Sequence, residues 1–116
     1  MAGRPIHMTG DGTPRRSWLY MGDLAVWLWT ILMRGEAGRA YNVGSDEGYT
    51  IADAARLTAA TLHPGLAVSI TGAPTPGAPL NSYVPDIARA RDELRLRVRV
   101  PLEEALRRTA AWYLQS

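Results

Sequence analysis

The stretch GDGTPRRSWLYMGDLA, residues 10–25, decides how this chain of 116 residues is organised. Its first three residues form a turn signal, because glycine tolerates positive φ and aspartate hydrogen-bonds its own backbone. Arg15 and Arg16 follow and lead into the aromatic and apolar residues 17–21, which predict a second strand or an extended segment. Arginine presents a planar fork of donors that matches phosphate oxygens, and a rigid strand would fix its direction. The pattern indicates phosphate binding, with solvated arginines or an arginine–carboxylate bridge as the alternatives.

The next segment predicts a helix over residues 22–34 that is apolar nearly all round. Asp23 stands in its first turn and Arg34 in its last, where the helix dipole favours an anion and a cation. A helix without a polar face is buried on several sides. A chain this small offers little to cover it, so we expect a contiguous apolar surface around Trp27 and Trp29, larger than the few hundred Å² usual for soluble monomers.

The remaining patterns predict further strands and helices, and so an α/β fold. Thr50 suits a helix N-cap, with Asp53 in the capping-box position three residues on. The segment 40–44 is apolar without alternation, as in a strand covered on both faces. The other predicted elements are strands 5–9 and 66–71, helices 51–62 and 86–94, a Pro/Gly loop 72–79, and a final helix from Pro101 with a buried stripe of Leu102, Leu106, Ala110 and Tyr113.

Composition excludes several classes of chemistry. The chain has no cysteine and no lysine, which excludes disulfides, cysteine metal sites and lysine-dependent catalysis, and two histidines disfavour a histidine metal site. A net charge of +2 from dispersed arginines argues against a nucleic-acid partner. The longest apolar run, Leu24–Met33, falls short of the roughly 20 residues of a membrane span, and no signal peptide is visible. We expect a soluble, cytoplasmic protein, and no catalytic motif is recognisable.

Four segments, in order, resemble the extended short-chain dehydrogenase/reductases, the NAD-dependent epimerases and dehydratases of nucleotide sugars such as dTDP-glucose 4,6-dehydratase and UDP-glucose 4-epimerase. The family motifs are a G-D-G turn followed by R-D and an aromatic residue, a Y-N-V-G strand, an E-L-G helix end and a closing helix with T-x-x-W. The matching segments are residues 10–25, GRAYNVGSDEGYTIADAARL at 38–57, YVPDIARARDELRL at 83–96 and PLEEALRRTAAWYLQ at 101–115.

The resemblance implies that residues 1–116 are a single C-terminal substrate-domain fragment, α/β in class, with short strands and about four helices. Members of the family hold NAD(P) in an N-terminal Rossmann domain that also carries a catalytic Tyr-x-x-x-Lys pair. This sequence has neither the pair nor the glycine-rich fingerprint. The resemblance therefore implies no catalytic, cofactor-binding or metal-binding residues in this chain, and no NAD(P) bound by the fragment alone.

The resemblance also assigns candidate substrate-binding residues. Arg16 stands where the family has an arginine that contacts the diphosphate, although Ser17 replaces the aspartate that usually follows it. Ser82 stands where a second arginine usually precedes the tyrosine, here Tyr83. Thr50 would lie near the nucleotide by analogy.

Three functions remain open at this point. The chain is the nucleotide-sugar-binding portion of an epimerase or dehydratase, catalytically incomplete, with weak affinity for a nucleoside-diphosphate sugar. Alternatively, it is a non-catalytic binding or regulatory module that completes a separate Rossmann-domain chain or forms a homo-oligomer. The third possibility is a nonfunctional truncated remnant.

Overall fold

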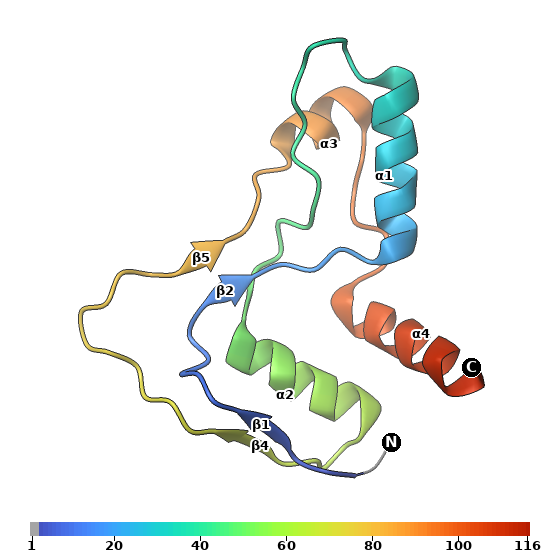
Figure 1. Ribbon diagram of the computed structural model, residues 1–116. Coiled ribbons are helices and arrows are strands. Elements are labelled where there is room, and N and C mark those ends of the chain that lie inside the picture. Colours follow the sequence, from blue (N-terminus) through green and yellow to red (C-terminus); the bar gives the residue numbers. More distant parts are fainter. Residues whose placement is uncertain (1–2) are drawn as a thin grey trace.

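The computed structural model describes residues 3–116 and has the expected α/β character (Figure 1). Four helices and five short strands alternate irregularly along these residues. The helices are α1 (Met21–Arg34), α2 (Ile51–Leu62), α3 (Ala88–Leu94) and α4 (Leu102–Gln115). The strands are β1 (Ile6–Met8), β2 (Arg15–Arg16), β3 (Tyr49–Thr50), β4 (Val68–Ile70) and β5 (Ser82–Tyr83).

The strands form two small sheets. Strand β1 runs parallel to β4, with Ile6 opposite Val68. Strand β2 is the centre of the second sheet, antiparallel to β3 and parallel to β5. In Figure 1, β2 and β5 lie between the part of the chain that holds α1 and α3 and the part that holds α2, β1 and β4.

The glycine turn after β1 covers the beginning of α2. The carbonyl of Pro14 accepts a hydrogen bond from Ile51 N at 2.9 Å, and that of Gly12 accepts one from Ala52 N at 3.1 Å. Gly12 has φ +74°, and a Cβ there would lie 2.8 Å from the Cβ of Ala52. Only glycine allows the turn to approach α2 this closely, because it tolerates positive φ and has no side chain. The sequence motif therefore places β2 next to the N-terminus of α2.

A compact core lies between α1, α3 and the segment that follows α3. Trp27 is 1% exposed and packs in a cluster with Ile87, Ala90, Leu94 and Leu96. The indole Nε1–H donates to the carbonyl of Arg97 at 3.0 Å, so the buried ring keeps its polar atom satisfied.

Two predicted strands were wrong. Residues 17–20 have no regular structure, because the strand is formed by the two arginines before them and helix α1 already begins at Met21. Residues 40–44 also form no strand among the described residues, since a strand needs a hydrogen-bonded neighbour and none lies beside them. Tyr41 and Val43 instead pack against the Trp27 cluster.

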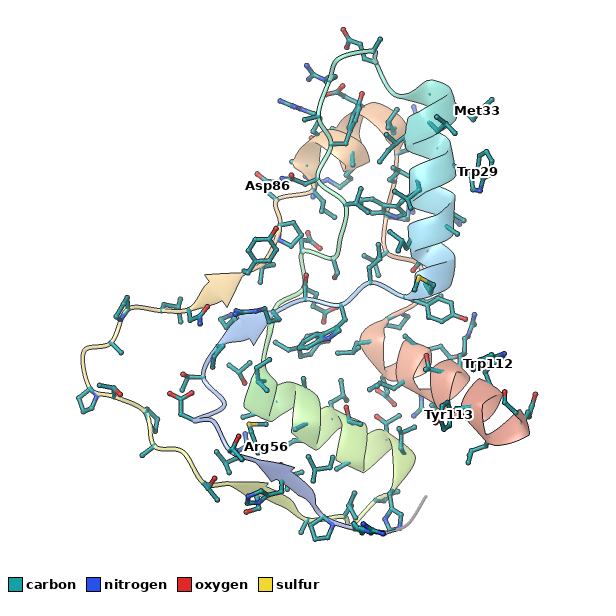
Figure 2. The ribbon with its side chains drawn as sticks, viewed as in Figure 1. Trp29, Met33, Arg56, Asp86, Trp112 and Tyr113 are labelled. Atoms are coloured by element: carbon teal, nitrogen blue, oxygen red, sulfur yellow. The ribbon has the colours of Figure 1, made fainter. Side chains whose placement is uncertain are left out.

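The expected buried stripe of the final helix was wrong in part. Leu102, Leu106 and Ala110 are half-buried, but the Tyr113 side chain is 75% exposed. Trp112 and Tyr113 both lie on the last turns of α4 (Figure 2), beyond the part of the helix that faces the rest of the chain. The buried contact of α4 is made by Ala105.

Helix α1 is buried on one side only, so this chain leaves the rest of its apolar surface uncovered. Asp23 and Trp27 are its buried residues. The expected apolar surface is present on the opposite side, where Trp29 and Met33 point away from the molecule (Figure 2). We call this surface the outer face of α1; its exposed residues are Met21, Val26, Leu28, Trp29, Leu32 and Met33.

The whole molecule is flat and open. It measures 47 × 45 × 17 Å, and its radius of gyration is 16.9 Å, whereas a compact chain of this length has about 13 Å. Its accessible surface is 8086 Å², against about 6,200 Å² for a folded monomer of this mass. The difference exceeds the roughly 800 Å² that each partner buries in a standard protein–protein interface.

Candidate functional site

The second sheet brings all four sequence-predicted site residues together. In the pairing of β2 with β3, Arg15 lies opposite Thr50. In the pairing of β2 with β5, Arg15 lies opposite Ser82 and Arg16 opposite Tyr83. Three stretches that are far apart in the sequence therefore meet around the arginine pair, which the spacing of the residues did not predict.

The Arg16 guanidinium is held in a fixed direction. Its Nη1 donates to the carbonyls of Arg15 (2.7 Å) and Asn81 (3.3 Å), and its Nη2 donates to the Oδ1 of Asn81 (3.1 Å). Among the described residues no carboxylate pairs with Arg16, so the arginine–carboxylate alternative does not describe it. A guanidinium has five N–H donors, and these contacts leave two of them for a ligand. Asn81 is the orienting residue that sequence reasoning missed.

Arg15 has a structural role beside it. Its Nη2 donates to the carbonyl of Gly48 at 2.9 Å, which ties β2 to the segment leading into β3. A Cβ on Gly48 would lie 2.8 Å from the Cγ2 of Val84 and 3.2 Å from the Arg15 Nη2. This close packing and the hydrogen bond give Arg15 a role in holding the sheet together.

Thr50 and the residues of β5 differ in how many of their polar groups are free to bind a ligand. The Thr50 hydroxyl accepts a hydrogen bond from Asp53 N at 3.0 Å, which confirms the predicted N-cap and engages one lone pair of its oxygen. Ser82 and Tyr83 are exposed, Tyr83 by 76%, and no described residue hydrogen-bonds either side chain. The β5 edge of the sheet is therefore accessible.

Acidic residues near the sheet are engaged locally. The Tyr49 hydroxyl donates to Oε1 of Glu47 at 2.7 Å, and this hydrogen bond raises the pKa of Tyr49. In the glycine turn, the Thr13 N–H donates to Oδ1 of Asp11 at 3.0 Å and lowers the pKa of that carboxyl. A hollow of about 360 Å³ opens beside this turn, lined in part by Thr9, Gly10 and Asp11.

The residues present do not fit NAD(P). A dinucleotide pyrophosphate binds free N–H groups at the N-terminus of a helix after a glycine-rich turn. In this chain the glycine turn lies beside the N-terminus of α2. The N–H groups there are already engaged, because those of Ile51, Ala52 and Asp53 donate to Pro14, Gly12 and Thr50. Residues 3–116 also hold no group of three side chains placed to bind a metal ion, and none of their helices is long and apolar enough to cross a membrane.

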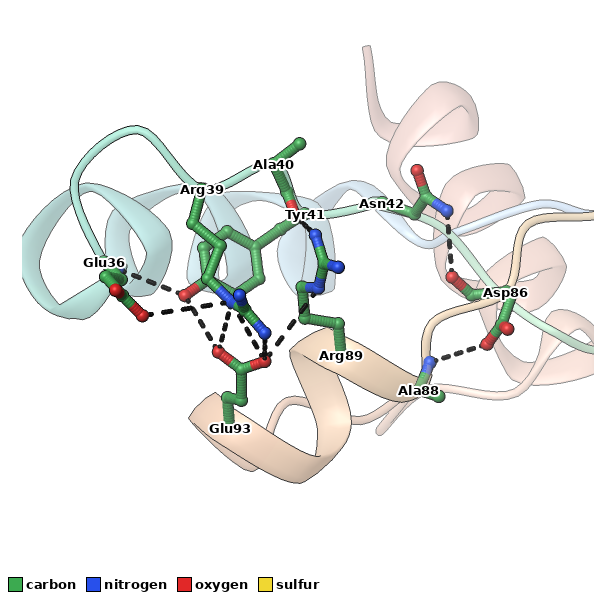
Figure 3. A network of polar contacts seen from close by, with 9 residues as sticks. All are labelled: Glu36, Arg39, Ala40, Tyr41, Asn42, Asp86, Ala88, Arg89 and Glu93. Atoms are coloured by element: carbon green, nitrogen blue, oxygen red, sulfur yellow. Dashed lines mark hydrogen bonds and ion pairs between the residues drawn. The ribbon is translucent and has the colours of Figure 1, made fainter.

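The most connected polar network lies away from the sheet (Figure 3). Arg39 donates to both carboxylate oxygens of Glu93, with Nε at 2.7 Å and Nη2 at 2.6 Å. The hydrogen bond lowers the pKa of Glu93 and raises that of Arg39. Arg89 donates to the carbonyl of Ala40 at 2.8 Å. The network fastens the loop after α1 to α3, and its role is structural.

Comparisons with known proteins agree with this architecture. The model of the NAD dependent epimerase/dehydratase family matches residues 1–44. The dTDP-glucose 4,6-dehydratase of Neisseria gonorrhoeae is 26% identical over 129 aligned positions, covering 100% of this chain. The crystal structure of dTDP-glucose 4,6-dehydratase from Bacillus anthracis in complex with NAD superposes with a TM-score of 0.81 over 98% of the chain, at 20% identity. The UDP-glucose 4-epimerase of Thermotoga maritima, with UDP-glucose, superposes with a TM-score of 0.80 over 97%, also at 20% identity.

The chain spans only 36% of the length of the Neisseria enzyme and 36% of each of the two structures. The part that it matches is their C-terminal portion. The two structural matches support the fold alone, because each is 20% identical to the chain. The family model describes NAD dependent epimerases and dehydratases, and the sequence relatives are named dTDP-glucose 4,6-dehydratases. On these grounds the chain is similar to the C-terminal portion of members of the NAD-dependent epimerase/dehydratase family.

Proposed function

We propose that this chain is the nucleotide-sugar-binding C-terminal portion of an NAD-dependent sugar epimerase or dehydratase, and that it is catalytically incomplete by itself. The observation that carries the proposal is the sheet β3-β2-β5, which gathers Arg16, Thr50, Ser82 and Tyr83 from three separate stretches. The relatives named for dTDP-glucose and the structure holding UDP-glucose support a nucleoside-diphosphate sugar as the ligand.

In this proposal Arg16 binds the diphosphate. Asn81 and the carbonyl of Arg15 already fix the guanidinium through three contacts, so little side-chain entropy is lost when the two remaining N–H groups meet phosphate oxygens. The exposed Tyr83 ring, opposite Arg16 in the sheet, gives the base or the sugar an apolar face to pack on. Ser82 contributes a hydroxyl but no charge, which keeps the affinity low.

Calorimetric titration with a dTDP- or UDP-sugar tests this proposal. Arg16→Ala removes charge-assisted hydrogen bonds worth about 1.5–3 kcal/mol, so it should weaken binding roughly tenfold to a hundredfold. Arg16→Lys should recover only part of the loss, because an ammonium lacks the bidentate fork. Ser82→Arg should tighten binding by adding a second cation at the β5 edge.

The matched control is Arg56→Ala on α2, whose side chain is 61% exposed and pairs with Asp53. It changes the net charge as Arg16→Ala does but lies outside the sheet, so it should leave the affinity unchanged. Equal affinities for the wild type and Arg16→Ala would contradict the assignment of Arg16 to the diphosphate.

The proposed incompleteness has its own test. A hydride transfer needs NAD(P) held beside the substrate, and the described residues offer the cofactor no fitting site. We expect the purified chain, supplied with NAD, to convert no dTDP- or UDP-sugar to an epimerised or dehydrated product, as measured by chromatography of the nucleotide sugars. Turnover that survives further purification would contradict the proposal.

One observation favours a second candidate, a module that completes a separate cofactor-binding chain. On the outer face of α1, Trp29 is 66% exposed and Met33 is 74% exposed. Co-expression with the remaining part of the Neisseria gonorrhoeae dehydratase, followed by size-exclusion chromatography, tests for such a complex. Trp29→Glu should abolish co-elution, whereas a homo-oligomer would instead appear with the chain alone and be dispersed by the same substitution.

A further inference from the structure

A second basic site lies on the other side of the Trp27 core, between α1 and the segment that joins α3 to α4. In Figure 1 this segment runs alongside α1. The two enclose a hollow of about 210 Å³. We call it the arginine pocket, because its lining includes four arginines, Arg34 at the end of α1 and Arg95, Arg97 and Arg99 at alternate positions of the segment.

The arginines of this pocket are not neutralised. Among residues 3–116, no carboxylate oxygen lies within 4.0 Å of any of the four guanidinium groups. Elsewhere in the chain ion pairs are common, and they engage Arg39, Arg56, Arg89, Arg91, Arg107 and Arg108. The one acid that lines the pocket, Asp23, directs its Oδ2 to the backbone N–H groups of Arg99 (3.0 Å) and Val100 (2.9 Å). Four cations against one carboxylate leave the pocket with a surplus of positive charge.

The backbone that carries these arginines is fixed before any ligand arrives. The indole of Trp27 donates to the carbonyl of Arg97, and Asp23 accepts from the N–H groups of Arg99 and Val100, so the segment is anchored to α1. Burial alternates along it: Leu94 and Leu96 are buried, and the arginines between and after them are exposed. Anchored in this way, the arginines need less reorganisation to converge on one ligand.

Arg95 adds an independent observation. It is the single non-glycine residue with positive φ among the described residues, at φ +56° after the end of α3. Glycine is the default in this left-handed position at a helix C-terminus, because a Cβ is disfavoured there. Residues kept in such conformations cluster at ligand sites, where the strain has a use. An arginine in this position places a fourth cation at the pocket.

From the charge surplus, the anchored backbone and the strained arginine we propose that the arginine pocket binds a compact phosphate-bearing anion, of the size of a pyrophosphate group or a phosphate monoester. A volume of about 210 Å³ lies below the roughly 300–1,000 Å³ of pockets that enclose drug-sized ligands. The site therefore suits a phosphate group and not a whole nucleotide. The arginine pocket shares no strand with the sheet β3-β2-β5, so this proposal does not depend on the proposed function.

Calorimetric titration of the 116-residue chain with inorganic pyrophosphate at low ionic strength tests the proposal. We expect saturable binding, and a loss of affinity of about tenfold or more in Arg97→Gln and in Arg99→Gln, because each removes charge-assisted contacts. Arg56→Gln is the matched control and should bind as the wild type does. The same losses in Arg97→Gln and Arg99→Gln are expected when the two substitutions are made in an Arg16→Ala background, which separates this site from the nucleotide-sugar site.

The variant Arg95→Gly distinguishes a loss of binding from a loss of folding. Glycine relieves the strained position, so the melting temperature should hold or rise while the pyrophosphate affinity falls. Absence of pyrophosphate binding by the wild type would overturn the proposal, and so would equal affinities for the wild type, Arg95→Gly and Arg97→Gln. Tighter binding of a single-stranded DNA oligonucleotide than of pyrophosphate, lost in the same variants, would also overturn it in favour of an extended polyanion.

Discussion

Two tryptophans two positions apart on α1 have opposite environments. Trp27 is 1% exposed in the core cluster, whereas Trp29 is 66% exposed on the outer face. The sequence identifies both as apolar helix residues but cannot separate them, because the side that becomes buried depends on Leu94 and Leu96, which lie almost seventy positions downstream. The apolar pattern of α1 fits a helix buried on either side, so the sequence does not show which of the two tryptophans lies in the core.

This difference predicts unequal effects on stability. Trp27→Ala leaves a cavity and removes the partner of the Arg97 carbonyl, and it should lower the free energy of unfolding by about 3–5 kcal/mol. Trp29→Ala should change it by no more than about 0.5 kcal/mol in the isolated chain. Urea denaturation of both variants measures the difference. A loss of similar size in the two variants would contradict the burial of α1 described above.

At the scale of the elements, the sequence was most informative where a helix boundary depends on a local interaction. The Thr50 cap and all four helices could be predicted, since capping and apolar periodicity involve near neighbours. The strands at 17–21 and 40–44 could not, because pairing depends on segments far away in the chain. For the same reason, the sequence motif identified Arg16 but not Asn81, whose contact with it spans 65 positions.

Substitutions at the start of α2 and at the end of α3 should change the stability in opposite directions. Thr50→Ala removes the side-chain cap of α2 and should cost about 1 kcal/mol of stability. Thr61→Ala, at the far end of the same helix, is the matched control and should have a smaller effect. Arg95→Gly should raise the stability by about 1 kcal/mol, because an L-residue in the left-handed region is strained by about that amount. Thermal unfolding of the three variants checks both signs.

The ion pair between Arg39, in the loop after α1, and Glu93 on α3 should make a pH-dependent contribution to stability. The hydrogen bond from Arg39 lowers the pKa of Glu93 in the folded chain. A depressed carboxyl pKa stabilises the fold above the unfolded value of about 4.3, and this contribution is lost as the pH falls through the folded value. Between pH 6 and pH 3 the melting temperature should therefore fall less in Glu93→Gln than in the wild type. The difference should be small, since both side chains are partly exposed; an equal fall in the two proteins would contradict it.

At the scale of the whole molecule, the flat shape and the outer face of α1 leave much surface exposed. The accessible surface is 8086 Å², against about 6,200 Å² for a folded monomer of this mass. In the second candidate function proposed above, a separate chain would cover part of this surface. We expect Trp29→Ser combined with Met33→Ser to reduce self-association in light scattering without lowering the melting temperature.

We propose that a nucleotide sugar binds at the sheet β3-β2-β5 through Arg16. The most direct measurement is the change in backbone amide chemical shifts when the isotopically labelled chain is titrated with a dTDP-sugar, since it detects weak binding and locates it. We expect the largest changes at Arg15–Arg16, Tyr49–Thr50 and residues 81–83, and their loss in Arg16→Ala. Changes confined to the arginine pocket, or no changes at saturating ligand, would contradict it.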